Sequence, residues 1–238
     1  INIIEKNIKR IKADIIEEKD LINQIFYKTF NYDLKKYQKL KKIKIYNLDF
    51  NNFSNNIDIR NSVKFHRPSG KHIIKDLKRI NTKKIKDFIS EKIVLGKTIS
   101  PNDFYEDGNF FYVSMADIKK WKFDKSNAKK VSNNYSEKNY KQSVRKNDLI
   151  IARSGEGTIG KLALIDQNDL NGIFSDFTIR IRLKNYNIKF AYYYFRSFYF
   201  QELIEINKKG LGNNTNIFPN QLMEFPIIDI SVEKQKND

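Results

Sequence analysis

The sequence predicts an α+β protein that is rich in antiparallel strands and begins with a long coiled-coil-type helix. Isoleucines recur at spacings of three and four over the first 25 residues, and short apolar runs bounded by turn residues follow residue 80. The first pattern is typical of a heptad seam and the second of short strands. We therefore predict a helix over 1–30, a basic connector over 31–79, a mixed domain over 80–230, and a tail or further helix over 231–238.

The composition indicates a globular protein with an anionic partner. The chain has 238 residues, 40% of them hydrophobic, and its 45 Lys and Arg against 28 Asp and Glu give a formal net charge of +17. A charge of this sign and size predicts salt-sensitive binding to nucleic acid. Part of it follows from a general richness in Lys, Asn and Ile, as expected from an AT-rich genome.

Two absences narrow the class of protein. The sequence contains no cysteine, which excludes disulfides and thiolate zinc sites and is consistent with a reducing cytoplasm. It also contains no apolar run near the roughly 18 residues of a spanning helix, so no membrane contact is expected. Only His66 and His72 offer imidazole ligands, with no third ligand nearby, so no metal or other cofactor is expected.

The N-terminal helix carries a narrow isoleucine stripe with charged residues on its other faces. A helix of roughly 28 residues extends about 42 Å, and a stripe this narrow on it favours a partner helix. The alternative is an amphipathic helix that lies on its own domain. The seam consists of Ile1, Ile4, Ile8, Ile11, Ile15, Ile22 and Ile25.

The connector is irregular and rich in Lys and Asn. Only Leu34, Tyr37, Leu40 and Ile43 form a short helical face, and the lysines around them are interpreted as a solvated face.

Beyond residue 80 the sequence predicts strands and one helix. The candidate strands are 84–89, 110–113, 148–153, 161–165, 175–183 and 226–230. In strand 175–183 the apolar residues alternate, which places Arg180 and Arg182 on a solvated face. A helix over 188–209 ends at Gly210, and its aromatic residues are expected to pack in the core rather than stack on bases.

The segment 147–166, NDLIIARSGEGTIGKLALID, imitates two nucleotide-binding signatures. Gly155, Gly157 and Gly160 match G-x-G-x-x-G, and 155–161 matches the first seven positions of a phosphate loop. Both signatures require a following helix, and the phosphate loop requires Ser or Thr after the Lys. Here Leu162 follows, and 161–165 is short and apolar. We therefore predict a strand, a glycine turn and a second strand.

The tip of this hairpin presents Arg153, Ser154 and Lys161 to a phosphate backbone or to base edges. A purely structural hairpin and a phosphate-loop-like nucleotide-binding enzyme are the alternatives. After the helix, Asn213, Asn214 and Asn216 lie near Lys208 and Lys209, which is the mixture expected where base edges meet phosphates. A plain loop is the alternative there.

The order of these elements is similar to the target-recognition domain of type I restriction-modification specificity subunits. The resemblance covers roughly 80–235. Its specific part is the glycine hairpin followed by the loop 210–217, which we call the Gly-Asn loop. Two departures affect loop shape: GKTIS lacks the usual second Gly and Pro, and Glu156-Gly157 is inserted into the hairpin turn. The matching segments are GKTIS at 96–100, FFYVSMADI at 110–118, ARSGEGTIGKLALI at 152–165, GLGNNTNI at 210–217 and FPIIDISVEKQ at 225–235.

The resemblance implies a non-catalytic, cytoplasmic component of a prokaryotic restriction-modification complex. The domain would read a short sequence in double-stranded DNA, and the helix 1–30 would be the spacer helix that docks a DNA methyltransferase subunit. That partner would bind S-adenosylmethionine. The residues expected on DNA are Lys97, Thr98, Ser100, Arg153, Ser154, Lys161, Lys208, Lys209, Asn213, Asn214 and Asn216.

The sequence contains a single recognition domain, whereas the family's subunits usually carry two. The chain is thus a half-subunit, a fragment, or the C-terminal recognition domain of a fused methyltransferase. In the first two cases, a second copy of the chain or a second recognition domain would complete the specificity subunit.

Overall fold

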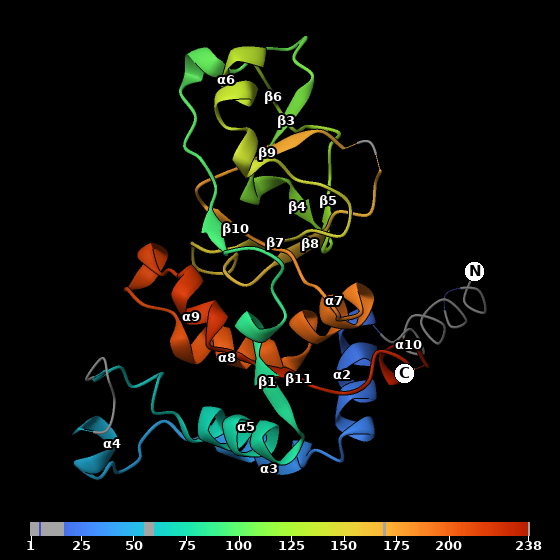
Figure 1. The fold of residues 1–238 in the computed structure, drawn as a ribbon. Helices are drawn as coiled ribbons and strands as arrows, with labels where there is room; N and C mark the ends of the chain where they lie inside the picture. The colour runs from blue at the N-terminus through green and yellow to red at the C-terminus, as the bar shows by residue number, and fades with distance from the viewer. Residues whose placement is uncertain (1–4, 6–16, 55–59, 169, 238) are drawn as a thin grey trace.

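The computed structural model of the chain describes residue 5 and residues 17–54, 60–168 and 170–237. Five isoleucines of the predicted seam, Ile1 to Ile15, lie outside these residues. The fold is α+β, as predicted, with two sheets stacked at one end and helices gathered at the other (Figure 1).

A six-stranded sheet forms the middle layer. Its strand order is β2-β10-β7-β8-β5-β4, and every neighbouring pair is antiparallel except β5 and β8. The strands are β2 (Val94–Leu95), β4 (Ile118–Lys119), β5 (Lys122–Phe123), β7 (Leu149–Ala152), β8 (Leu162–Leu164) and β10 (Thr178–Ile181).

Successive side chains along each strand point to opposite faces of this sheet, and both faces are buried. In β7, Leu149 and Ile151 join the core that faces the helices, whereas Ile150 and Ala152 join a second core. That second core lies against a three-stranded sheet of β3 (Phe110–Val113), β6 (Lys130–Val131) and β9 (Gly172–Phe174). A helix, α6 (Asn133–Lys138), lies beside this small sheet.

Helices lie on the other side of the six-stranded sheet, with α7 (Ile188–Arg196) and α8 (Phe198–Asn207) next to it (Figure 1). Farther from the sheet, α2 (Glu18–Thr29) packs on α7, α5 (Pro68–Arg79) on α8, and α3 (Leu34–Lys41) on α5. The short helices are α4 (Asn51–Ser54), α9 (Pro219–Met223) and α10 (Lys234–Asn237). No helix in the described ranges combines the length and the apolar character that a membrane crossing needs. Short 3₁₀ turns cover Ile85–Asp87, Pro101–Asp103, Met115–Asp117, Tyr140–Gln142 and Gly212–Asn214.

A two-stranded antiparallel ribbon joins the beginning of the domain to its end. It pairs β1 (Thr82–Lys84) with β11 (Pro226–Ile228). The predicted strand 84–89 is wrong beyond its first residue, because Lys84 ends β1 and a 3₁₀ turn begins at Ile85. The side chain of Asp87 accepts a hydrogen bond from the Lys84 backbone N–H at 2.9 Å, which holds this turn.

The predicted helix 188–209 is two helices that meet at Ser197. The backbone of Ser197 is extended, and its hydroxyl donates to the Tyr194 carbonyl at 2.7 Å. The prediction that its aromatic residues pack in the core is confirmed for most of them: Phe190, Tyr194 and Tyr199 are buried, while Tyr193 is exposed.

The prediction that Arg180 and Arg182 are solvated is wrong. Arg180 is 6% exposed and ion-paired to Glu91 at 2.7 Å, and Arg182 pairs with the fully buried Asp148 at 2.5 Å. The second sheet covers the face that alternation assigned to solvent, so these largely buried arginines need carboxylate partners.

Candidate nucleic-acid interface

Two predicted contact segments, 96–100 and 153–161, lie at one edge of the six-stranded sheet, together with the turn 175–177, which was not predicted as a contact. Strand β10 is antiparallel to both β2 and β7, and β7 is antiparallel to β8. Strands β2 and β7 therefore end at this edge, and strands β10 and β8 begin there. The segment 96–100 leaves β2 here, the turn 175–177 enters β10, and the hairpin 153–161 joins β7 to β8.

The hairpin is a strand, a glycine turn and a strand, as predicted. Gly155, Gly157 and Gly160 have φ angles of 87°, 77° and 85°, which side chains rarely adopt. The Thr158 hydroxyl donates to the Ser154 carbonyl at 2.7 Å and closes the turn. Because β8 begins at Leu162, no helix follows the glycines. This overturns the alternative of a phosphate-loop enzyme.

The Gly-Asn loop is bonded to the base of this hairpin. The Gly155 N–H donates to the Thr215 carbonyl at 3.2 Å, and the Ile217 N–H donates to the Arg153 carbonyl at 2.9 Å. Lys209 and Asn216 exchange two backbone hydrogen bonds across the loop, at 2.8 and 2.7 Å.

Gly210 permits this loop closure. Its φ is 99°, and a Cβ built there would lie 2.3 Å from the Asn214 carbonyl oxygen. The hairpin and the loop therefore form one rigid tip, held together by main-chain bonds.

The third segment reaches the same tip through the turn 175–177. The Asp176 N–H donates to the Lys97 carbonyl at 3.3 Å, and Arg153 Nε donates to the Asp176 carbonyl at 2.8 Å. The Arg153 guanidinium lies 5.4 Å from the centre of the Phe218 ring. Its Nη1 has no hydrogen-bond partner among the residues that the structure describes. The Arg153 side chain thus links the hairpin to Phe218 and to the turn 175–177, and the backbone of that turn is bonded to Lys97.

The predicted contact residues differ in exposure. Lys97, Thr98, Ser100, Lys161, Lys209 and Asn214 are exposed, Arg153 and Asn216 are half-buried, and Ser154 is buried. The side chain of Asn213 lies outside the described part of the structure.

Lys208 differs from the other lysines, because its side chain is 3% exposed and already paired. Its Nζ lies 2.8 Å from Glu205 and 3.4 Å from Glu156, which belongs to the hairpin. Burial by itself would lower the pKa of Lys208, but the two glutamates outweigh it and raise that pKa. Lys208 holds the loop against the hairpin.

The tip also carries apolar side chains that the sequence analysis did not select. Leu211 is 88% exposed, Phe177 49% and Phe218 39%. They lie in the Gly-Asn loop, in the turn before β10, and next to Arg153. Phe177 was predicted to point toward the core, and no signal in the sequence distinguishes it from the buried residues of that alternation.

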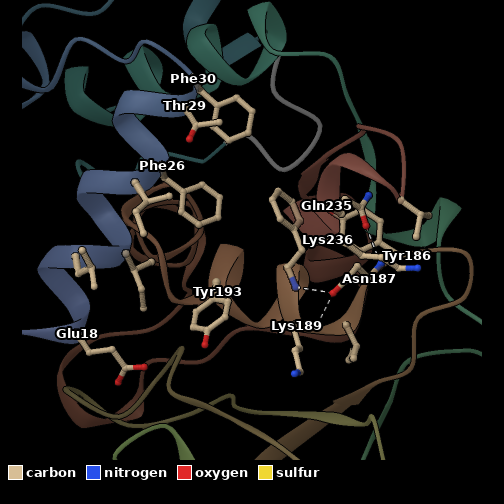
Figure 2. Close-up of a pocket in the computed structure, with 16 residues that line it drawn as sticks. Glu18, Phe26, Thr29, Phe30, Tyr186, Asn187, Lys189, Tyr193, Gln235 and Lys236 are labelled. Carbon is tan, nitrogen blue, oxygen red and sulfur yellow. Dashed lines mark hydrogen bonds between the residues drawn. The ribbon is translucent and has the colours of Figure 1, made fainter. Parts of the chain in front are cut away.

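A second surface, an apolar groove, lies beside α2. Figure 2 shows Phe26 of α2 and Phe30, which caps this helix, across from Tyr193 of α7 and Tyr186, which precedes α7, with Gln235 and Lys236 from α10 nearby. Ile22 of the predicted seam is 6% exposed and packs on the domain, whereas Ile25 is 42% exposed and lines the groove. The described part of this helix therefore lies on its own domain and leaves an apolar strip uncovered.

Comparison with known proteins gives one family and several solved structures. Residues 77–238 match the family model described as the type I restriction modification DNA specificity domain. No curated protein sequence matches the chain.

Three solved structures are similar to the chain, all at low sequence identity. The HsdS subunit from Thermoanaerobacter tengcongensis is 13% identical with a TM-score of 0.49, over 69% of this chain and 40% of that one. The type I S subunit from M. genitalium is 19% identical with a TM-score of 0.40, over 61% and 33%. A chain from a type I R-M system, solved in a study of its assembly and conformational transition, is 13% identical with a TM-score of 0.46, over 66% and 35%.

The chain spans at most two fifths of the length of these solved chains. The family match, in contrast, covers well over half of the 238 residues and includes the hairpin, the Gly-Asn loop and both sheets. The chain belongs to the family of type I restriction modification DNA specificity domains.

Proposed function

We propose that this protein recognises a short sequence in double-stranded DNA as the specificity component of a type I restriction-modification system. The observation that carries the proposal is the tip at the edge of the six-stranded sheet, where main-chain bonds join the glycine hairpin to the Gly-Asn loop in a domain of this family. The protein is non-catalytic in this proposal. A partner methyltransferase/endonuclease supplies the chemistry, and its methyltransferase binds S-adenosylmethionine.

The residues of the tip divide into two roles. Arg153, Asn214 and Asn216 combine donors and acceptors that suit base edges, and Asn213 belongs with them from its sequence position. Lys161, Lys209 and Lys97 are exposed cations that suit phosphates, with the hydroxyls of Thr98, Ser100 and Ser154 beside them. Lys208 positions the loop, because two glutamates already balance its charge.

The partner surface in this proposal is α2. The segment 1–30 is the spacer, but it is not the single helix predicted from the sequence, because the backbone of Glu17 is extended and α2 begins at Glu18. The uncovered strip around Leu21 and Ile25 receives an apolar helix of the methyltransferase or of a second recognition unit. The domain boundaries proposed from the sequence, 1–30, 31–79, 80–230 and 231–238, follow the same scheme. The whole protein is a half-subunit, a fragment, or part of a fused methyltransferase.

The test compares Arg153→Ala with Lys161→Ala. Each protein selects duplexes from a random-sequence library, and the affinity for the selected sequence is measured over a range of salt concentrations. Arg153→Ala relaxes selection at one position, because a good bidentate pair contributes about 1 to 3 kcal/mol of base discrimination. Lys161→Ala keeps the selected sequence and lowers the slope of log affinity against log salt by about 0.9.

Two outcomes contradict this proposal. Wild-type protein that enriches no sequence would exclude sequence-specific recognition by this chain. Equal losses on all sequences in both variants would exclude the division of roles between Arg153 and Lys161.

A further inference from the structure

A basic groove opens next to the Gly-Asn loop, on the side of the connector. One wall is the face of α5 that carries Lys71, Ile74 and Lys78, and the opposite wall comes from α8, α9 and the segment between them. The floor includes Lys83 and Lys84 of β1. We call this the connector groove.

The connector groove leads directly into the tip. Arg60 and Lys209 line both this groove and the neighbouring hollow formed by 208–212 and Thr215. Arg60 donates from Nη1 to the Asn207 carbonyl at 3.1 Å and from Nη2 to the Lys208 carbonyl at 3.0 Å. The connector is therefore bonded to the beginning of the Gly-Asn loop.

The lining is strongly cationic. Against two carboxylates, those of Asp87 and Glu224, the lining has six cationic side chains: Arg60, Lys71, Lys78, Lys83, Lys84 and Lys209.

Carboxylates balance the charges of Lys83 and Lys84, but no carboxylate of the described residues balances those of Lys71 and Lys78 on α5. Lys84 pairs with Glu224 at 2.6 Å, and Lys83 pairs with Asp229 at 3.0 Å. Lys71 donates to the neutral Asn52 amide oxygen at 2.8 Å, and Lys78 has no ion pair with any residue of the described ranges. Both lysines are exposed. Among the residues that the structure describes, the α5 wall therefore presents two lysines without an ion pair.

We propose that the connector groove holds the phosphate backbone of the duplex beside the sequence that the tip reads. This inference rests on the proposed function. Lys71 and Lys78 are seven residues apart on one helix face, or about 10 Å at 1.5 Å per residue, which corresponds to roughly three base steps at 3.4 Å. On the facing wall, the exposed amide of Asn220 adds a neutral partner that suits phosphate oxygens, whereas the amides of Asn207 and Gln221 already donate to the Leu203 and Asn207 carbonyls.

The connector groove extends the interface beyond the family match. That match begins at residue 77, whereas Arg60 and Lys71 precede it. Contacts to phosphates are independent of base identity. The groove therefore adds affinity and fixes the path of the duplex without changing which sequence is read.

The test uses the full chain and a matched pair of double variants. Lys71→Ala with Lys78→Ala removes the α5 wall charges. Lys35→Ala with Lys75→Ala removes the same charge from exposed positions of α3 and α5 that do not line the groove. Circular dichroism and thermal melting confirm that both variants fold like wild type.

Binding is measured to a random-sequence duplex of about 40 base pairs over a range of salt concentrations. For the groove variant we expect about tenfold weaker binding at low salt and a slope of log affinity against log salt that falls by about 2, since each phosphate contact contributes about 0.9. We expect the control variant to stay within about twofold of wild type, because a surface charge without a phosphate contact contributes little.

The outcomes separate this inference from the proposed function. Equal affinity and equal slope in the groove and control variants overturn the inference, even where wild type still selects a sequence. A wild type that selects no sequence overturns the proposed function, while the difference in slope between the two variants still tests the groove. A changed sequence preference in the groove variant would also overturn the inference, because phosphate contacts carry no base information.

Discussion

Lys208 and Lys209 are neighbours in the sequence but differ in their surroundings. Lys208 is buried between Glu205 and Glu156, whereas Lys209 is exposed at the mouth of the connector groove. We predict that Lys208→Met lowers the free energy of unfolding by about 2 kcal/mol, because hydrogen bonds between charged groups are lost. Lys209→Ala changes it by less than about 0.5 kcal/mol. Urea denaturation of both variants measures the contrast.

The pH dependence of the unfolding free energy lost in Lys208→Met gives a control. Burial by itself would raise the pKa of Glu205, but Lys208 and Lys64 outweigh it and hold that pKa below its usual value. A carboxylate with a lowered pKa stabilises the folded state above its unfolded-state pKa, and this stabilisation is lost as the pH falls through the folded value. The cost of Lys208→Met therefore shrinks below about pH 4. An equal cost at pH 7 and at pH 3 would contradict the assigned pairing.

At the scale of single elements, α2 has two apolar sides with different partners. Ile22 and Phe26 pack on the domain, where the Phe26 ring lies 5.8 Å from that of Phe190, while Leu21 and Ile25 remain exposed. We predict that Ile22→Asp destabilises the protein by more than about 3 kcal/mol, because it buries an unpaired charge. Under the proposed function, Ile25→Asp leaves the fold and DNA binding unchanged and abolishes association with a partner methyltransferase.

Thermal melting, DNA binding and co-purification with the methyltransferase check these two substitutions. Tyr27→Asp, at a half-buried position of α2 outside the groove lining, is the control for added charge. Retained association in Ile25→Asp would show that the partner binds elsewhere.

Strand prediction succeeded where a short apolar run bounded by turn residues is buried on both faces. The predicted 110–113 and 161–165 correspond to β3 and β8, and 148–153 contains β7. The helix α5 was missed, because Pro68 and Gly70 in KFHRPSGKH are typical of a loop. Pro68 instead occupies the first turn of α5, where it is tolerated, and Gly70 lets α5 approach Ile206 of α8 closely, with a built Cβ at 2.8 Å.

The candidate site was predictable in its chain segments but not in its side-chain roles. The glycines of the hairpin and the strand after Lys161 follow from local patterns, which are readable in the sequence. The burial of Lys208 depends on Glu156, which is 52 residues away in the chain. The burial of Arg180 in β10 and of Arg182 just after it depends on Glu91 and Asp148. Such distant pairings leave no periodic signal in a single sequence.

At the scale of the whole molecule, the connector shares its core with the recognition domain. The largest buried cluster runs from Ile22 to Ile228 and includes Tyr37 and Leu77 of the connector. Buried hydrogen bonds reinforce this packing: the Tyr37 and Ser69 hydroxyls donate to Glu202 of α8 at 2.8 and 2.7 Å. We therefore expect the connector and the domain to unfold together.

Leu77→Ala tests this expectation. Leu77 is 1% exposed, so its truncation costs about 2 to 5 kcal/mol through lost burial and a residual cavity. The single tryptophan, Trp121, lies in the turn between β4 and β5, outside the connector. In one cooperative unit, the urea midpoints from Trp121 fluorescence and from far-UV circular dichroism fall by the same amount. Ile45→Ala, at a 91% exposed connector position, leaves both midpoints in place. A Trp121 midpoint that stays at the wild-type value in Leu77→Ala would instead make the connector a separate folding unit.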